Sequence, residues 1–197
     1  MSGVPILRPM TALLARMIGF GNAARCRVVL LAYVVVLAAS LGASAKTPPV
    51  GDDARKFVDA HNAVRAAVRR PADYMGPWAP VPPVTWSDEV ASTAQAWAEH
   101  LRDTRKCGLL HSDTHYGENL AAGKDMDAEG AVRMWAGEID KYSYSPIFEF
   151  EARSGHYSQI VWRKTTDIGC GRVTCGRDAI VVCRYSPAGN RIGNAPY

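Results

Sequence analysis

The chain has 197 residues, with 23 basic and 19 acidic side chains. Four of the basic residues and none of the acidic ones lie in residues 1–45, so residues 46–197 carry 19 of each. That balance lacks the positive surplus with which nucleic-acid-binding domains contact phosphates, and we therefore expect no nucleic-acid partner. The length that remains suits one domain with a substantial core.

Residues 1–45 have the pattern of a secretory signal. A basic start is followed by an uncharged apolar stretch, and Ala43-Ser44-Ala45 before Lys46 is a small-residue cleavage site. We therefore predict a signal peptide over 1–45 and a protein that is secreted, or periplasmic in a bacterium. The alternative is an uncleaved signal anchor, because the uncharged stretch is close to the minimum length of a membrane span. Only in that case do we expect contact with a membrane.

A short lead over 46–51 precedes the helical part of the chain. Apolar residues at three- and four-residue steps predict a first helix over 52–70, which Pro71 ends. Residues 71–83 contain five prolines and predict a stiff extended loop. Further along, we predict a helix capped by Ser87, followed by an irregular stretch or short strand over about 107–125. A third helix is expected over about 128–141, with Val132, Trp135 and Ile139 facing inward, and a helical turn over about 157–162.

The end of the chain has the pattern of a β-hairpin. Residues 168–175 and 179–185 are strand-like, and Gly176-Arg177-Asp178 between them is a turn signal. Helices followed by an antiparallel hairpin predict the α+β fold class.

Cysteine usage agrees with export. Of the five cysteines, Cys26 lies in the predicted signal segment, and the other four predict two disulfides. The hairpin turn places Cys170 opposite Cys183, and neighbouring cysteines on antiparallel strands can form a disulfide. That leaves Cys107 to pair with Cys175.

Motifs in order along residues 52–197 carry a family resemblance. They are His61-Asn62-Ala63-Val64-Arg65, Tyr116-Gly117-Glu118-Asn119-Leu120, Gly155-His156-Tyr157-Ser158-Gln159-Ile160-Val161-Trp162, Cys183-Arg184-Tyr185-Ser186-Pro187-Ala188-Gly189-Asn190 and Gly193-Asn194-Ala195-Pro196-Tyr197. Together they resemble the CAP superfamily of cysteine-rich secretory, antigen five and pathogenesis-related proteins, and the last resembles the ending of plant pathogenesis-related members. The resemblance implies a CAP (SCP) domain over 52–197. It also implies an α-β-α sandwich, with a small antiparallel sheet between helical layers, and the same two disulfides.

The resemblance places the family's cleft tetrad on His111, Glu118, Glu138 and His156. Two neutral imidazoles and two carboxylates suit Zn²⁺, which takes nitrogen and oxygen ligands. If only the histidines and a water fill the metal shell, a glutamate can act as general base, and the protein is a zinc-dependent hydrolase or protease. The alternative is a structural hydrogen-bond network without turnover. Robust enzymatic activity is not the usual assignment for this family, so we assign no catalytic residue and favour a non-enzymatic protein.

The resemblance also implies a binding module for a sterol or other lipid, with a role in defence or host interaction. The apolar segment 74–84 lies between prolines and is a candidate to line a groove; the alternative is an ordinary surface loop. A further alternative is a precursor, because residues 187–197 resemble a C-terminal signalling peptide released from plant members. Arg184 and Ser186 depart from the Asn and Asp that usually precede that cut.

Overall fold

The computed structural model describes residues 51–72, 74–147 and 154–197. The predicted signal peptide and nearly all of the short lead lie outside the described residues, so both stay predictions. Within the described ranges, no helix combines the length and the apolar character needed to cross a membrane.

The described residues form five helical segments and four strands. The helices are α2 (Asp52–Ala67), α3 (Asp88–Arg105), α4 (Ala128–Ala136), the 3₁₀ helix η1 (Gly137–Lys141) and α5 (Gly155–Ile160). The strands are β1 (Thr85–Trp86), β2 (Gly117–Lys124), β3 (Asp167–Cys175) and β4 (Asp178–Ser186). They form one sheet in the order β1-β3-β4-β2, in which β4 is antiparallel to both neighbours and β1 is parallel to β3.

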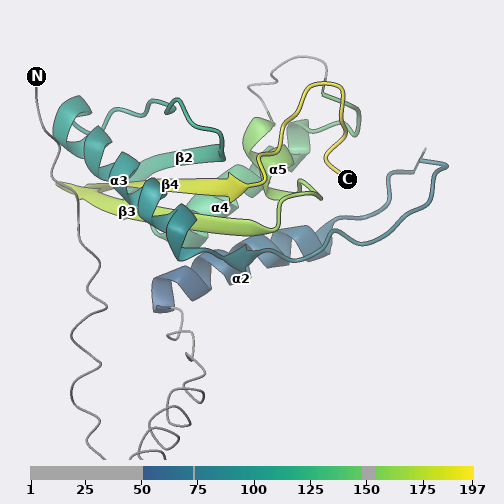
Figure 1. Ribbon diagram of the computed structural model, residues 1–197, viewed down its shortest axis with the longest axis horizontal. Coiled ribbons are helices and arrows are strands. Elements are labelled where there is room, and N and C mark those ends of the chain that lie inside the picture. The colour runs from purple at the N-terminus through teal and green to yellow at the C-terminus, as the bar shows by residue number, and fades with distance from the viewer. Residues whose placement is uncertain (1–50, 73, 148–153) are drawn as a thin grey trace, which may run out of the picture. The chain divides into compact units, whose positions relative to one another are not determined.

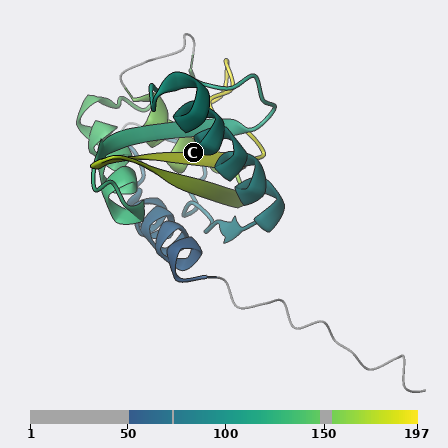
Figure 2. The same ribbon diagram turned by 90° about the vertical axis from the view of Figure 1, so that its left-hand side faces the viewer.

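The sheet lies between two helical layers, as the resemblance implies. Helix α3 covers one face, and α2, α4 and α5 cover the other (Figures 1 and 2). Each interface has its own apolar cluster: Leu101 packs with Ile180 under α3, whereas Phe57 and Trp135 belong to the larger cluster on the opposite side. The predicted α-β-α sandwich is confirmed. The parallel strand β1 was not predicted, because two residues are too short to give an alternating pattern.

Helix α3 packs directly against the backbone of β3. A Cβ atom at Gly169 would collide with the backbone of Ala91, and one at Gly171 with the backbone of Gln95. The two glycines are therefore needed for the close approach of helix to strand. The predicted cap of α3 is present, because the Ser87 hydroxyl accepts a hydrogen bond of 3.3 Å from the backbone N–H of Val90.

Two helix predictions need correction. Helix α2 ends at Ala67 rather than at 70, because Val68 already adopts an extended conformation (φ −59°, ψ 132°) ahead of Pro71. The helix predicted over 128–141 is α-helical only to Ala136 and continues as η1. The tighter 3₁₀ winding turns Ile139 away from the core, where we had expected it, and leaves it 51% exposed.

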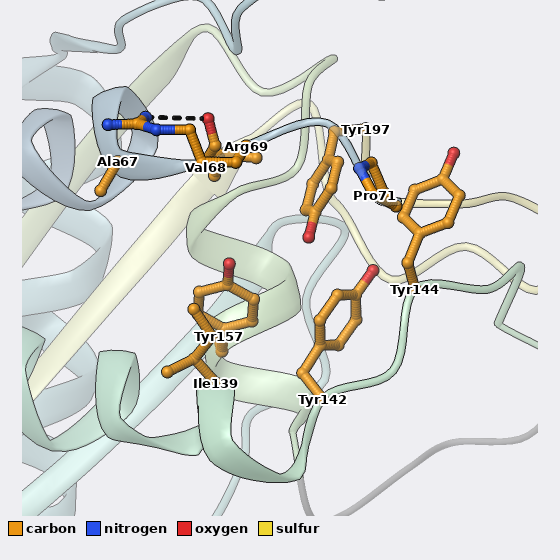
Figure 3. A pocket seen from close by; sticks show the side chains of 9 residues that line it. All are labelled: Ala67, Val68, Arg69, Pro71, Ile139, Tyr142, Tyr144, Tyr157 and Tyr197. Atoms are coloured by element: carbon orange, nitrogen blue, oxygen red, sulfur yellow. Dashed lines mark hydrogen bonds between the residues drawn. The ribbon is translucent and has the colours of Figure 1, made fainter. Parts of the chain in front are cut away.

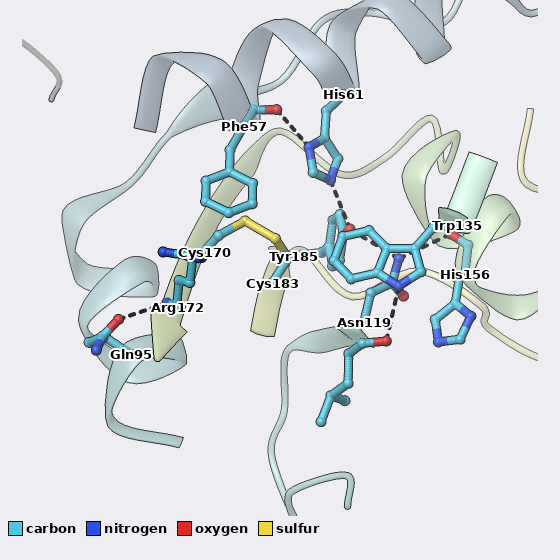
Figure 4. Close-up of a disulfide and its surroundings, with 11 residues drawn as sticks. Phe57, His61, Gln95, Asn119, Trp135, His156, Cys170, Arg172, Cys183 and Tyr185 are labelled. Carbon is cyan, nitrogen blue, oxygen red and sulfur yellow. Dashed lines mark hydrogen bonds between the residues drawn. A yellow bond between two sulfur atoms is a disulfide. The ribbon is translucent and has the colours of Figure 1, made fainter. Parts of the chain in front are cut away.

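The predicted hairpin and its disulfides are confirmed. Cys170 and Cys183 are cross-strand partners of β3 and β4, and a disulfide joins them (Figure 4). A second disulfide joins Cys107 to Cys175 and ties the loop after α3 to the hairpin.

Candidate functional site

The carboxylate of Glu118 lies at the start of β2 and is held by four donors. One oxygen, Oε1, accepts hydrogen bonds from Nδ1 of His111 (3.0 Å) and the backbone N–H of Ser112 (2.9 Å). The other, Oε2, accepts from the Ser112 hydroxyl (2.6 Å) and from Nε of Arg184 (3.2 Å). Because an ionised carboxylate only accepts, His111 carries its proton on Nδ1.

These contacts decide the charge of Glu118. Burial alone would raise the pKa of its carboxyl group, since only 4% of the side chain is exposed. The hydrogen bonds from His111 and Ser112 and the charge of Arg184 outweigh burial and hold the pKa below its ordinary value. Glu118 is therefore an ionised acceptor at neutral pH.

The second histidine–glutamate pair lies at the start of α5. Glu138, in η1, accepts a hydrogen bond of 2.7 Å from Nδ1 of His156 through Oε1. Its Oε2 accepts from the backbone N–H groups of His156 (2.9 Å) and Tyr157 (3.1 Å). Glu138 thus satisfies two of the free N–H groups at the start of the helix and orients the imidazole of His156 at the same time.

A buried network holds His156 from the other side. His61 donates through Nδ1 to the carbonyl of Phe57 (2.7 Å), so its Nε2 accepts from the phenol of Tyr185 (2.8 Å). Asn119 donates both to that phenol (3.0 Å) and to the carbonyl of His156 (3.1 Å). Figure 4 shows this chain of contacts, with the His156 ring near Trp135. The network joins α2, β4, β2 and α5 behind the histidine.

Sequence reasoning missed the role of Arg65. This residue is 1% exposed, and its guanidinium donates only to backbone carbonyls. The acceptors are those of Pro82, Ile160, Trp162 and Thr165. Burial lowers its pKa to about 10. A local signal existed, because Arg65 lies one helical turn after His61 on the same face of α2. The pattern did not show what the arginine contacts.

The structure therefore arranges the predicted tetrad as two histidine–glutamate pairs. Each glutamate binds Nδ1 of its histidine, and no described residue makes a hydrogen bond to Nε2 of His111 or His156. Residues 51–72, 74–147 and 154–197 contain no group of three or more His, Cys, Asp and Glu side chains that could hold one metal ion. A metal site with all four residues as ligands stays a prediction.

A pocket of about 310 Å³ lies where α2, η1, α5 and the end of the chain meet (Figure 3). It is lined by apolar and tyrosine side chains with one arginine: Ala67, Val68, Arg69, Pro71, Ile139, Tyr142, Tyr144, Tyr157 and Tyr197. The hydroxyl of Tyr142 is buried, and burial raises its pKa, with a further contribution from the neighbouring Tyr197 hydroxyl. The pocket therefore offers an apolar wall that also carries tyrosine and arginine side chains.

The apolar segment 74–84 lies beside this pocket rather than in its lining. The ring of Tyr74 packs against Tyr144 with their centroids 5.7 Å apart, and the ring of Trp78 packs against Tyr197 at 5.9 Å. The segment contributes an aromatic layer that supports the pocket, and a groove along the segment itself stays a prediction. The aromatic layer buttresses two of the tyrosines that line the pocket.

Comparison with known proteins identifies the family. Residues 58–185 match the family model described as the Cysteine-rich secretory protein family, CAP. The chain belongs to this family. Among curated CAP relatives, pathogenesis-related protein 1 of Arabidopsis thaliana is 35% identical over 167 residues, covering 84% of this chain and 95% of the relative. Pathogenesis-related protein 1A1 of Solanum lycopersicum is 41% identical over 141 residues, covering 70% and 73%.

Solved CAP structures agree with the fold. The crystal structure of NaASP2 with Zn²⁺ aligns with a TM-score of 0.61 at 29% identity, covering 77% of this chain and 88% of that one. Hookworm platelet inhibitor aligns with a TM-score of 0.59 at 22% identity and supports the fold alone, covering 75% and 76%. The resemblance drawn from the sequence motifs is confirmed. These relatives and the described residues give no support to the hydrolase or the peptide-precursor alternative.

Proposed function

We propose that this CAP protein is an exported, non-enzymatic binding module that takes up a sterol or another lipid in the tyrosine-lined pocket. The pocket is the observation that carries the proposal. Export is supported by the signal-like sequence over 1–45 and by the description of the family as secretory. Relatives named pathogenesis-related proteins support a role in defence.

The chemistry of the lining suits a ligand that is mostly apolar with a small polar head. Pro71, Val68 and Ile139 offer aliphatic surface, and tyrosine rings provide flat walls for a rigid ring system. Polar groups of the lining, the guanidinium of Arg69 and the tyrosine hydroxyls, can bind a hydroxyl or carboxyl head group.

Binding can be tested at one exposed side chain of the lining. Ile139 is 51% exposed, so Ile139→Glu places a charge in the pocket without removing core packing. Met134, on α4, is 46% exposed and does not line the pocket, so Met134→Glu is a matched control. Titration of the purified protein with a fluorescent sterol and a fluorescent fatty acid should show binding that Ile139→Glu weakens at least about tenfold and Met134→Glu leaves unchanged. No uptake of either probe at micromolar concentrations would contradict the proposal.

The proposal includes a divalent-metal site, with Zn²⁺ as the metal, at the two histidine–glutamate pairs. The donor set fits zinc, because an imidazole that gives its Nδ1–H to a carboxylate presents Nε2 to a metal. His111 and His156 would thus be the ligands, and Glu118 and Glu138 would orient them. The Zn²⁺ structure of NaASP2 supports this choice of metal.

Calorimetric titration with ZnCl₂ tests the metal site. The double variant His111→Ala/His156→Ala should lose zinc binding, whereas His100→Ala, on the exposed side of α3, should bind as the unchanged protein does. Equal affinity in all three proteins would overturn this part of the proposal.

A further inference from the structure

Arg184 is a buried cation beside one of the predicted metal-site residues. It is the cross-strand partner of Glu118 in the β2–β4 ladder, and only 9% of its side chain is exposed. Its Nε lies 3.2 Å from Oε2 of Glu118, and its Nη2 donates to the Ser112 hydroxyl at 2.8 Å. The same hydroxyl donates to Oε2 of Glu118 at 2.6 Å. Glu118, Ser112 and Arg184 are thus hydrogen-bonded to one another in a closed ring.

This ring saturates the Glu118 carboxylate. A carboxylate offers about four lone-pair positions, and Glu118 has four donors from His111, Ser112 and Arg184. A metal ion could bind Glu118 only by displacing one of them. Separating a buried ion pair leaves its partner charged and unpaired, which is strongly unfavourable.

The other pair is built differently. Glu138 accepts from Nδ1 of His156 and from two backbone N–H groups, and among the described residues no Lys or Arg forms an ion pair with it. The negative charge of Glu138 is thus not cancelled by a side-chain cation, whereas that of Glu118 is. A divalent cation near both pairs would be attracted by Glu138, whereas the charge of Arg184 cancels the attraction of Glu118.

We propose that Arg184 is a built-in cation that keeps Glu118 out of the metal shell and lowers the divalent-metal affinity of the site. Glu118 is then a positioning residue, which fixes the imidazole of His111, and the histidine nitrogens are left as ligands. The inference rests on the metal site proposed above. It assigns to Arg184 the control of how tightly that site holds a cation.

Zinc titrations of four further variants test the inference. Arg184→Gln should raise the affinity at least about tenfold, and adding Glu118→Gln should abolish that gain. Arg177→Gln removes the same charge from the exposed hairpin turn and should change nothing. Ser112→Ala is a milder variant, with a smaller gain expected because it breaks the ring but keeps the charge of Arg184. Circular dichroism and thermal unfolding with and without EDTA confirm folding and give a second measure of metal binding.

Each outcome bears on one proposal. If the histidine double variant binds zinc like the unchanged protein, the metal site itself is wrong. If zinc binding depends on the histidines but Arg184→Gln gives no gain, the role assigned to Arg184 is wrong and the metal site stands. If Arg184→Gln does not fold, Ser112→Ala decides: unchanged or weaker affinity overturns the inference, and tighter affinity supports it.

Discussion

Nε2 of His61 accepts a hydrogen bond of 2.8 Å from the phenol of Tyr185, a residue 124 positions away in the sequence. Burial lowers the pKa of this histidine to about 4, although the hydrogen bond to the Phe57 carbonyl acts in the opposite direction and nearby Arg65 lowers it further. His61 is therefore neutral, and its single proton fixes the direction of the network that ends at the His156 carbonyl.

We expect His61 to make the stability of the protein depend on pH. The folded-state pKa lies below the ordinary value of 6.5, so between pH 6.5 and 4 the unfolded chain binds a proton that the folded chain does not. The free energy of unfolding should therefore fall as the pH drops through this window, by about 3 kcal/mol in all. Denaturant unfolding of the disulfide-intact protein at a series of pH values measures it.

Two variants isolate this contribution. His61→Gln should be less stable at neutral pH but should lose most of the dependence between pH 6.5 and 4. His100→Gln, at an exposed position of α3, should keep it. An equal slope in His61→Gln and in the unchanged protein would refute the assignment.

Replacing the buried Arg65 should be costly even by another cation. Lysine cannot reproduce the planar set of donors that serves four carbonyls, so Arg65→Lys leaves buried acceptors unpaired. We expect a loss of about 3 kcal/mol in the free energy of unfolding. Arg69→Lys, at an exposed position, should stay within about 0.5 kcal/mol. Similar losses in the two variants, measured by urea unfolding, would show that Arg65 has no special role.

Two glycines should respond in opposite ways to alanine. Gly169→Ala puts a Cβ into the backbone of Ala91 and should cost about 3 kcal/mol by forcing α3 away from β3. Gly137 has a helical conformation (φ −62°, ψ −14°) and open space at its Cβ position. Gly137→Ala should therefore be neutral or stabilise the protein by about 0.5 kcal/mol. Thermal unfolding of both variants checks this, and a fully tolerated Gly169→Ala would contradict the packing of α3 on β3.

The end of the chain should be part of the folded domain. The backbone N–H of Gly189 donates to Oε1 of Gln159, and Asn190 contacts both the Ser158 hydroxyl and the Gly155 carbonyl. Removing residues 188–197 should therefore lower the free energy of unfolding by at least about 2 kcal/mol and remove Tyr197 from the pocket.

Ile192 supplies the control for this truncation. Its side chain is 71% exposed, and Ile192→Ser should leave stability and probe binding unchanged. If the truncated protein unfolds like the full chain and still binds the fluorescent probes, the terminal segment is dispensable, as a releasable peptide would be.

The sequence by itself determined the features that depend on short spacings. The hairpin turn set the register that pairs Cys170 with Cys183, and Ser87 marked the start of α3. Both follow from local backbone geometry, so a few neighbouring residues suffice to predict them. The family motifs added the layer order, which residue spacing could not supply.

Only the tertiary structure decided which distant side chains share a site. It paired His111 with Glu118 and His156 with Glu138, set Arg184 against Glu118 through the β2–β4 register, and gathered tyrosines from three segments into one pocket. Such contacts depend on how helices and strands pack, and no local period or spacing encodes them. The physical reason is that burial and charge are properties of the assembled neighbourhood, not of a position in the chain.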